Sequence, residues 1–187
     1  MSMRFFIALE IPPESRSELQ ILQGKLKSLI PEIRLTDNQK LHLTIAFIGE
    51  QSEDLKRNLV DVITKATTDI KPFMVIPAYI DAFPRLHNPH TFWVGVKGDL
   101  DKLFVLEERI KDGLIGLNLE VDNRRYLPHI AIGKVVDYKM TIEIEEDLEE
   151  FMLNHNFSPI QISSIKLFES VPSETFHQHN TLAEIAL

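Results

Sequence analysis

The chain has 187 residues, of which 28 are acidic and 20 are basic, so its formal net charge is −8, and it contains no cysteine. This length suits one domain or two small packed lobes, and 44% hydrophobic residues with only 7 Gly and 10 Pro exclude a disordered or fibrous protein. The lack of cysteine excludes disulfides, thiolate metal sites and a cysteine nucleophile, and the acidic balance argues against an extended nucleic-acid footprint.

The first half of the chain alternates strand-like and helix-like segments. Residues 5–11 are apolar and end at two prolines, which is typical of a buried strand. Leucines then recur at steps of three and four residues up to Ile30, which predicts an amphipathic helix closed by the next proline. Residues 41–48 and 73–83 are strand-like again, and between them Ser52 can cap a second helix.

The second half repeats this order. It predicts a strand over 91–96, a helix over 100–114, a strand over 127–136, a helix over 141–152, a strand over 160–168 and a closing strand over 181–187. Corresponding landmarks lie 85 to 87 residues apart: Phe6 and Phe92, Ile30 and Ile115, His42 and His129, Phe83 and Phe168. The constant offset indicates an internal repeat of about residues 4–85 and 90–170.

These elements predict an α+β fold, with two helices on one side of a mainly antiparallel sheet in each half. No flexible linker separates the halves, so we expect a single domain over residues 1–187. No window approaches the ~20 apolar residues of a membrane span, and the apolar start is too short for a signal peptide. We therefore expect a cytoplasmic monomer with no membrane partner.

Two strands carry histidines at matching positions of the repeat. Side chains alternate along a strand, so we expect these on the open face: His42, Thr44 and Ala46, and in the second strand His129, Ala131 and Gly133. Facing the helices we expect Leu43, Ile45 and Phe47, and Ile130 and Ile132. With pKa values near 6.5, one imidazole can take a proton while the other gives one, which suits cleavage of a phosphodiester. A single histidine in a strand is more often structural, and the matched pair favours catalysis.

Residues 41–50 closely resemble the first HxTx motif of bacterial and archaeal RNA 2′,3′-cyclic phosphodiesterases, also called 2′-5′ RNA ligases (LigT/ThpR-like), of the two-histidine phosphoesterase superfamily. The resemblance extends to residues 4–9, 83–85, 93–96, 128–129 and 167–170. It implies a bilobal fold in which two concave sheets face each other across a groove, with helices outside and one motif in each lobe.

The resemblance also implies a reaction, in which water opens a terminal 2′,3′-cyclic phosphate on RNA to a 2′-phosphomonoester. His42 would be the proton donor, His129 the proton acceptor and Thr44 a phosphate contact, with no metal or other cofactor and with ligation as the reverse reaction. Two alternatives stay open. The substrate could be a small nucleotide, such as a nucleoside 2′,3′-cyclic phosphate or ADP-ribose 1″,2″-cyclic phosphate, or the chain could bind RNA ends or nucleotides without turnover.

The chain departs from the family pattern after the second histidine. Ala131 stands where the family has Thr, so one hydroxyl that could bond the phosphate is missing. Lys134 stands where the family tends to have Arg, and strict alternation puts it on the opposite face from His129. Before the motif, Arg125 and Tyr126 could offer charge and a stacking ring to an RNA end; the alternative is a solvated loop with Tyr126 packed.

Other candidates have simpler interpretations. His177 and His179 have a spacing that could bind a metal, but a polar loop is the preferred interpretation. His87 and His90 flank a turn-like segment and are expected at the surface, and Trp93 is expected in the core.

Overall fold

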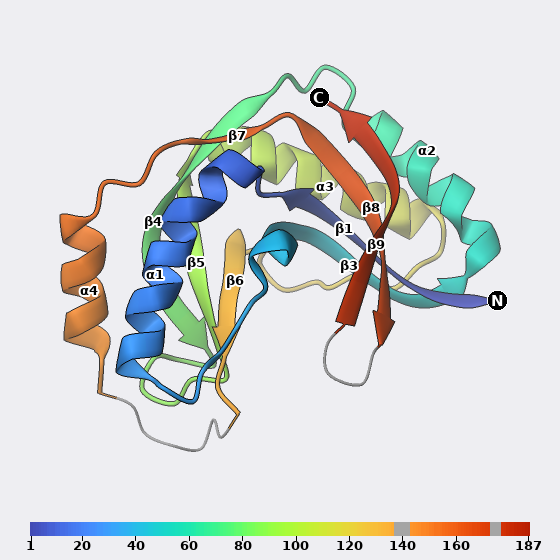
Figure 1. The fold of residues 1–187 in the computed structure, drawn as a ribbon. Helices are drawn as coiled ribbons and strands as arrows, with labels where there is room; N and C mark the ends of the chain where they lie inside the picture. The colour runs from blue at the N-terminus through green and yellow to red at the C-terminus, as the bar shows by residue number, and fades with distance from the viewer. Residues whose placement is uncertain (137–142, 173–176) are drawn as a thin grey trace.

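The computed structural model describes residues 1–136, 143–172 and 177–187, and the first two residues of the helix expected over 141–152 lie outside this part (Figure 1). The elements of the first half are β1 (Ser2–Glu10), α1 (Arg16–Leu29), β2 (Arg34–Leu35), β3 (His42–Ser52), α2 (Lys56–Ala66) and β4 (Phe73–Phe83). Short 3₁₀ turns cover Pro13–Ser15, Asn38–Lys40 and Glu53–Leu55. Those of the second half are β5 (Thr91–Gly98), α3 (Leu100–Gly116), β6 (His129–Lys134), α4 (Glu145–Asn154), β7 (Ile160–Ile162), β8 (Ser164–Pro172) and β9 (His177–Ala186).

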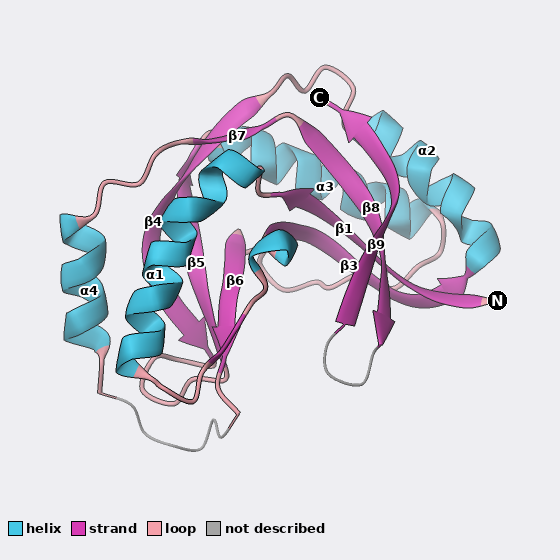
Figure 2. Ribbon diagram, in the orientation of Figure 1, coloured by secondary structure: helices cyan, strands magenta, loops and turns pink. Residues whose placement is uncertain are grey.

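The predicted α+β class is confirmed. Within the described residues, nine antiparallel strands form one curled sheet in the order β7-β4-β5-β6-β3-β1-β8-β9, with β2 paired to β6. Figure 2 shows the helices outside the curve of the sheet. Helices α1 and α4 contact β6 and β4, whereas α2 and α3 contact the part formed by β1, β3, β8 and β9. In the described part of the chain, no helix is long and apolar enough to cross a membrane.

The two sheets that we expected are two parts of one continuous sheet: β7, β4, β5 and β6 form one part, and β3, β1, β8 and β9 form the other. Each part contains strands from both halves of the chain. The β3 and β6 strands join the two parts through the pair Leu43 and Ile130. The last strand of the first half, β4, pairs with β5, and β8 returns to pair with β1. Because β4 and β5 are separated by a short loop, they pair as neighbours and carry the end of the first half into the other part. The internal repeat itself stays a prediction.

The core lies between the convex face of the sheet and the helices. The stripe of α1 is buried as its spacing predicts, since Leu19, Leu22 and Leu26 are inaccessible to solvent. They pack with strand residues such as Leu43 and Ile130. Burying a side chain of this size contributes about 1.5–3 kcal/mol, so this layer fixes which face of each strand points inward.

Two bulges change the expected alternation in β3. The register with β1 shifts twice, so that Phe6 pairs with Phe47 and Ile7 with Ala46. Phe47 is 72% exposed and its ring lies 6.2 Å from that of Phe6, whereas Ala46 packs against the core. The expectations that Ala46 is open and Phe47 inward are therefore wrong, because each extra residue reverses the faces that follow it.

A bulge in β6 changes which faces of the sheet Gly133 and Lys134 lie on. Trp93 pairs with Ala131, but Phe92 pairs with Gly133 and Thr91 with Lys134. A Cβ on Gly133 would lie 2.9 Å from buried Ile33, so this position faces the core. The expectation that Gly133 lies on the open face is therefore wrong. The extra residue brings Lys134 to the face that carries Ala131, which strict alternation does not allow.

Candidate functional site

The two histidines meet where the two parts of the sheet join. Leu43 and Ile130 are direct antiparallel partners. In that register His42 lies beside Ala131, and Thr44 lies beside His129, all on the face opposite the buried partners. The charge of His129 also lowers the pKa of His42, as expected for imidazoles on neighbouring strands. The sheet thus brings together the two motifs that the sequence separates by more than 80 residues.

Both imidazoles are held by the same backbone contact. The Nδ1 atom of His42 lies 2.6 Å from the carbonyl oxygen of Lys40, and Nδ1 of His129 lies 2.7 Å from that of Leu127. A carbonyl oxygen only accepts, so Nδ1 must carry the hydrogen in both rings. Nε2 is then the atom that gains or loses a proton, and each ring can act as an acid or as a base through that atom.

Burial disfavours the charged form of both histidines. Desolvation lowers the pKa of His42 most, and the charge of His129 lowers it further, against the hydrogen bond to the Lys40 carbonyl and the charge of Glu10. Desolvation also lowers the pKa of His129, against its bond to the Leu127 carbonyl. Both rings therefore lose their proton more readily than a histidine in water.

A group of charged side chains supports the strand beside His42. Glu10 is the direct strand partner of His42. Its carboxylate accepts a hydrogen bond of 2.9 Å from Arg16, which is only 9% exposed, and another from Lys166. Lys166 also lies 3.7 Å from Glu184. The carboxylate next to His42 is thus fixed by two cations.

Thr44 is tied to the loop before the second motif. The Tyr126 hydroxyl donates a hydrogen bond of 2.9 Å to the Thr44 carbonyl oxygen, and its ring lies 6.1 Å from that of Phe104. Burial raises the pKa of Tyr126, as expected for a phenol removed from water. The structure therefore gives Tyr126 a packing and positioning role in place of the stacking ring that we considered. Arg125 is exposed in the same loop.

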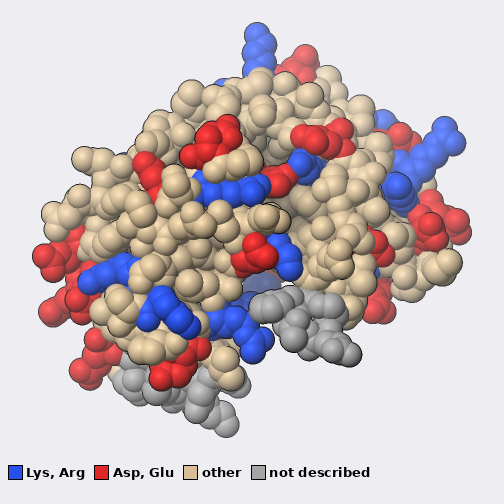
Figure 3. Space-filling model, in the orientation of Figure 1, with Lys and Arg blue, Asp and Glu red and all other residues tan. Residues whose placement is uncertain are grey.

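Positive charge reaches this face of the molecule in spite of the acidic composition. Lys134 is exposed and shares the face of Ala131. Figure 3 shows Lys and Arg side chains in and beside the hollow between the two parts of the sheet. This local positive charge can attract a small anionic group without an extended basic surface.

Aromatic rings flank each histidine. On one side the Phe6 ring lies 5.3 Å from that of His42 and stacks on Phe168 at 5.0 Å. On the other side the rings of Phe83 and Trp93 lie 5.2 and 5.6 Å from that of His129. Trp93 is 2% exposed, as expected of a core residue, but it lies on the face of Ala131.

His179 is a third histidine of the site, which the sequence analysis missed. It lies in β9 and not in a polar loop, and its ring is 5.5 Å from that of His42. The closing strand was expected over 181–187, and extending its alternation four residues towards the N-terminus would have included His179. Among the residues that the structure describes, no group of three or more His, Asp or Glu side chains is arranged to hold a metal ion.

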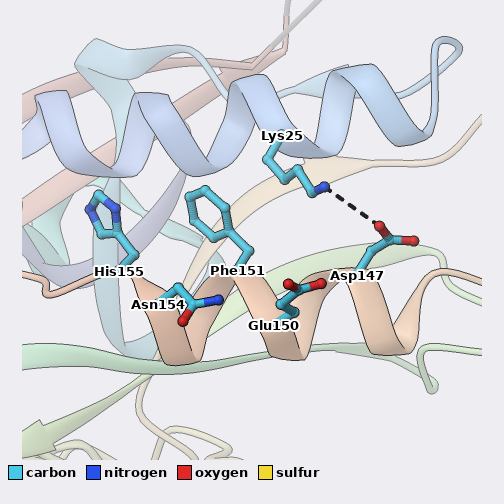
Figure 4. Close-up of a pocket in the computed structure, with 6 residues that line it drawn as sticks. All are labelled: Lys25, Asp147, Glu150, Phe151, Asn154 and His155. Atoms are coloured by element: carbon cyan, nitrogen blue, oxygen red, sulfur yellow. Dashed lines mark ion pairs between the residues drawn. The ribbon is translucent and has the colours of Figure 1, made fainter.

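A separate depression of about 310 Å³ lies between α1 and α4, away from these histidines (Figure 4). Lys25 and Asp147 form an ion pair of 3.6 Å across it. The remaining lining residues are Glu150, Phe151, Asn154 and His155. Its one cation is already paired and two carboxylates face it, so it is poorly suited to a phosphate.

Paired histidines on the open face of one curled antiparallel sheet are the arrangement that the resemblance to two-histidine phosphoesterases implies. The fold is also that of the LigT protein of E. coli in its apo form, with a TM-score of 0.77 and 21% identity over 100% of this chain and 98% of that one. It is likewise similar to the protein TT0787 of Thermus thermophilus, with a TM-score of 0.80 and 18% identity over 99% of this chain and 98% of that one.

Sequence comparison shows which known proteins the chain is similar to. The model of the family described as "LigT like Phosphoesterase" matches residues 9–93. Two curated relatives carry the name RNA 2′,3′-cyclic phosphodiesterase. That of Methanocaldococcus jannaschii is 26% identical over 90% of this chain and 91% of its own, and that of Thermotoga maritima is 25% identical over 97% and 94%. The chain is thus similar in sequence to LigT-like phosphoesterases over residues 9–93, and to these curated relatives over nearly its whole length.

Proposed function

We propose that the chain is an RNA 2′,3′-cyclic 3′-phosphodiesterase, which hydrolyses a terminal cyclic phosphate to a 2′-phosphomonoester. The observation that carries this proposal is the matched pair of Nδ1–carbonyl bonds at His42 and His129, which leaves both Nε2 atoms for proton transfer. The names of the curated relatives support the substrate. A net charge of −8 is compatible with it, since an RNA end needs only a local contact.

In the proposed mechanism the two imidazoles act on opposite sides of the phosphorus. Neutral His129 removes a proton from water through Nε2 while the water oxygen forms a bond to phosphorus. The bond between phosphorus and the ribose 3′ oxygen breaks, and charged His42 gives its Nε2 proton to that oxygen. The phosphate stays on the 2′ oxygen. Each such proton transfer typically contributes ~10²–10⁴ in rate.

Side chains around the pair would stabilise the charge on the phosphate. The Thr44 hydroxyl, beside His129, is the proposed hydrogen-bond donor, and Lys134 is a nearby source of positive charge. The proposal includes no metal or other cofactor, because the two histidines perform both proton transfers. With a 5′-hydroxyl in place of water, the reverse direction would join two RNA ends by a 2′-5′ bond.

The test is incubation of the pure protein, with EDTA, with RNA that ends in a 2′,3′-cyclic phosphate, followed by ³¹P NMR of the product. We expect a 2′-phosphomonoester, lost in His42→Ala and His129→Ala and retained in His87→Ala, which removes an exposed histidine next to α4. No product between pH 5 and 8 would refute the proposal. Turnover only of nucleoside 2′,3′-cyclic phosphate or ADP-ribose 1″,2″-cyclic phosphate would indicate the small-nucleotide alternative, and binding without turnover the non-catalytic one. Loss of activity on chelation would refute the metal-free mechanism.

A further inference from the structure

His179 reaches the site from the edge of the sheet. It pairs with Ser170 in the register of β8 and β9, and β9 is separated from β3 by β1 and β8. Its ring nevertheless lies 4.8 Å from that of Phe6 and 5.5 Å from that of His42, in edge-to-face arrangements. The curl of the sheet therefore brings this strand over the open face beside His42.

The ring of His179 is available to a ligand. Burial, and then the charges of His42, Lys40 and His177, lower its pKa to about 4, so the ring is neutral near pH 7. Within the described residues its nitrogens make no side-chain hydrogen bond. A neutral imidazole offers one N–H donor and one acceptor, which suits an uncharged polar group better than a phosphate.

The surface next to His179 is aromatic. Phe6 stacks on Phe168, and the exposed ring of Phe47 lies 6.2 Å from Phe6. Aromatic side chains of this kind bind nucleobases by stacking, and a polar ring at their border can bond the edge of the base. Phe6 and Phe168 are buried, so the ring open to a ligand is that of Phe47, and together with one neutral donor and acceptor at its border it matches a nucleobase.

We propose that His179 is a specificity-determining residue that contacts the nucleobase of the nucleotide bearing the cyclic phosphate. This inference rests on the proposed function, in which His42 protonates the ribose 3′ oxygen. The ribose and its base must then lie on the His42 side of the phosphorus, where the exposed ring of Phe47 and the ring of His179 lie around buried Phe6. The water molecule approaches from the side of His129.

The test compares two substrates, adenosine 2′,3′-cyclic phosphate and methyl β-ribofuranoside 2′,3′-cyclic phosphate, which lacks the base. We expect His179→Ala to lower kcat/KM about ten- to a hundredfold with the adenosine substrate, mainly through KM, and to leave the base-free substrate unchanged. His179→Phe keeps a ring but no hydrogen bond, and should lie between wild type and His179→Ala. His87→Ala is the matched control, since it removes an exposed histidine that lies beside the start of α4.

Two results would overturn the inference. An equal loss with both substrates would mean that His179 only supports His42. A loss that depends on the base in Tyr79→Ala, whose ring lies 5.7 Å from Trp93, but not in His179→Ala would put the nucleoside beside His129.

If the wild type turns over neither small substrate, the inference is tested by calorimetry, and the proposed function is decided separately by the assay with RNA ends. Binding of adenosine 2′-phosphate that is tighter than that of base-free ribose 2′-phosphate, with the difference lost in His179→Ala, would support it. Equal affinities would overturn it.

Discussion

Replacing Ala131 with Thr would test how much one hydroxyl contributes to this site. Ala131 lies beside His42, just as Thr44 lies beside His129, so the change would give both histidines a neighbouring hydroxyl. Ala131 is half-buried on the open face, and its strand partner Trp93 is almost fully buried. A β-branched side chain suits a strand, so the backbone should accept the substitution.

A hydrogen bond to a charged group contributes about 1.5–3 kcal/mol. At about 1.4 kcal/mol for each factor of ten, Ala131→Thr should raise kcat/KM by roughly ten- to a hundredfold. The assay is steady-state hydrolysis of RNA with a terminal 2′,3′-cyclic phosphate, with Tm measured in parallel. Ala131→Val is the matched control, because it has the shape of Thr without the hydroxyl, and it should show no gain.

Three results would contradict this reasoning. An equal gain in the Val and Thr variants would show that shape and not the hydroxyl is responsible. A loss in both would show that the added methyl groups crowd Trp93 or His42. An unchanged rate in a stable Thr variant would show that another group already bonds the phosphate.

The remaining predictions concern proton transfer and the support of Thr44. Because the pKa values of both histidines are lowered from 6.5, kcat/KM should follow a bell with its maximum below pH 6.5: His42 loses its proton on the alkaline side, and His129 gains one on the acidic side. A maximum above pH 7 in the pH–rate profile would contradict this. Tyr126→Phe removes the 2.9 Å bond to the Thr44 carbonyl, worth about 1 kcal/mol, and should lower Tm by about 2–4 °C. An unchanged Tm with a raised KM would instead indicate that the hydroxyl contacts the substrate.

The helices and most strands could be predicted because apolar spacing records which side of each element is buried. The strand expected over 73–83 coincides with β4, and the helix expected over 100–114 is two residues shorter than α3. The same rule placed His42 and Thr44 on one face of their strand, and His129 and Ala131 on one face of theirs. In each strand the buried residue between them, Leu43 or Ile130, fixes which face is open. A periodicity of two is a local property that the sequence displays directly.

Bulges could not be predicted in this way. Ala46, Phe47 and Ile48 are all apolar, so an inserted residue leaves the hydropathy pattern unchanged while it turns Phe47 outwards. The sequence also does not show which strands pair, so it could not place β9 against β8 or bring His179 to His42. Such contacts depend on the curl of the whole sheet.

The two histidines share one geometry but differ in their neighbours, and the difference supports their proposed roles. The direct strand partner of His42 is Glu10, whereas that of His129 is Gly95. A carboxylate favours the charged imidazole, although Arg16 and Lys166 share its charge, and the space over Gly95 is filled by the ring of Tyr79. A charged ring can only donate, and a neutral ring can accept. Glu10 offsets in part the burial that lowers the pKa of His42, which is compatible with the proposed roles of His42 as the proton donor and His129 as the acceptor.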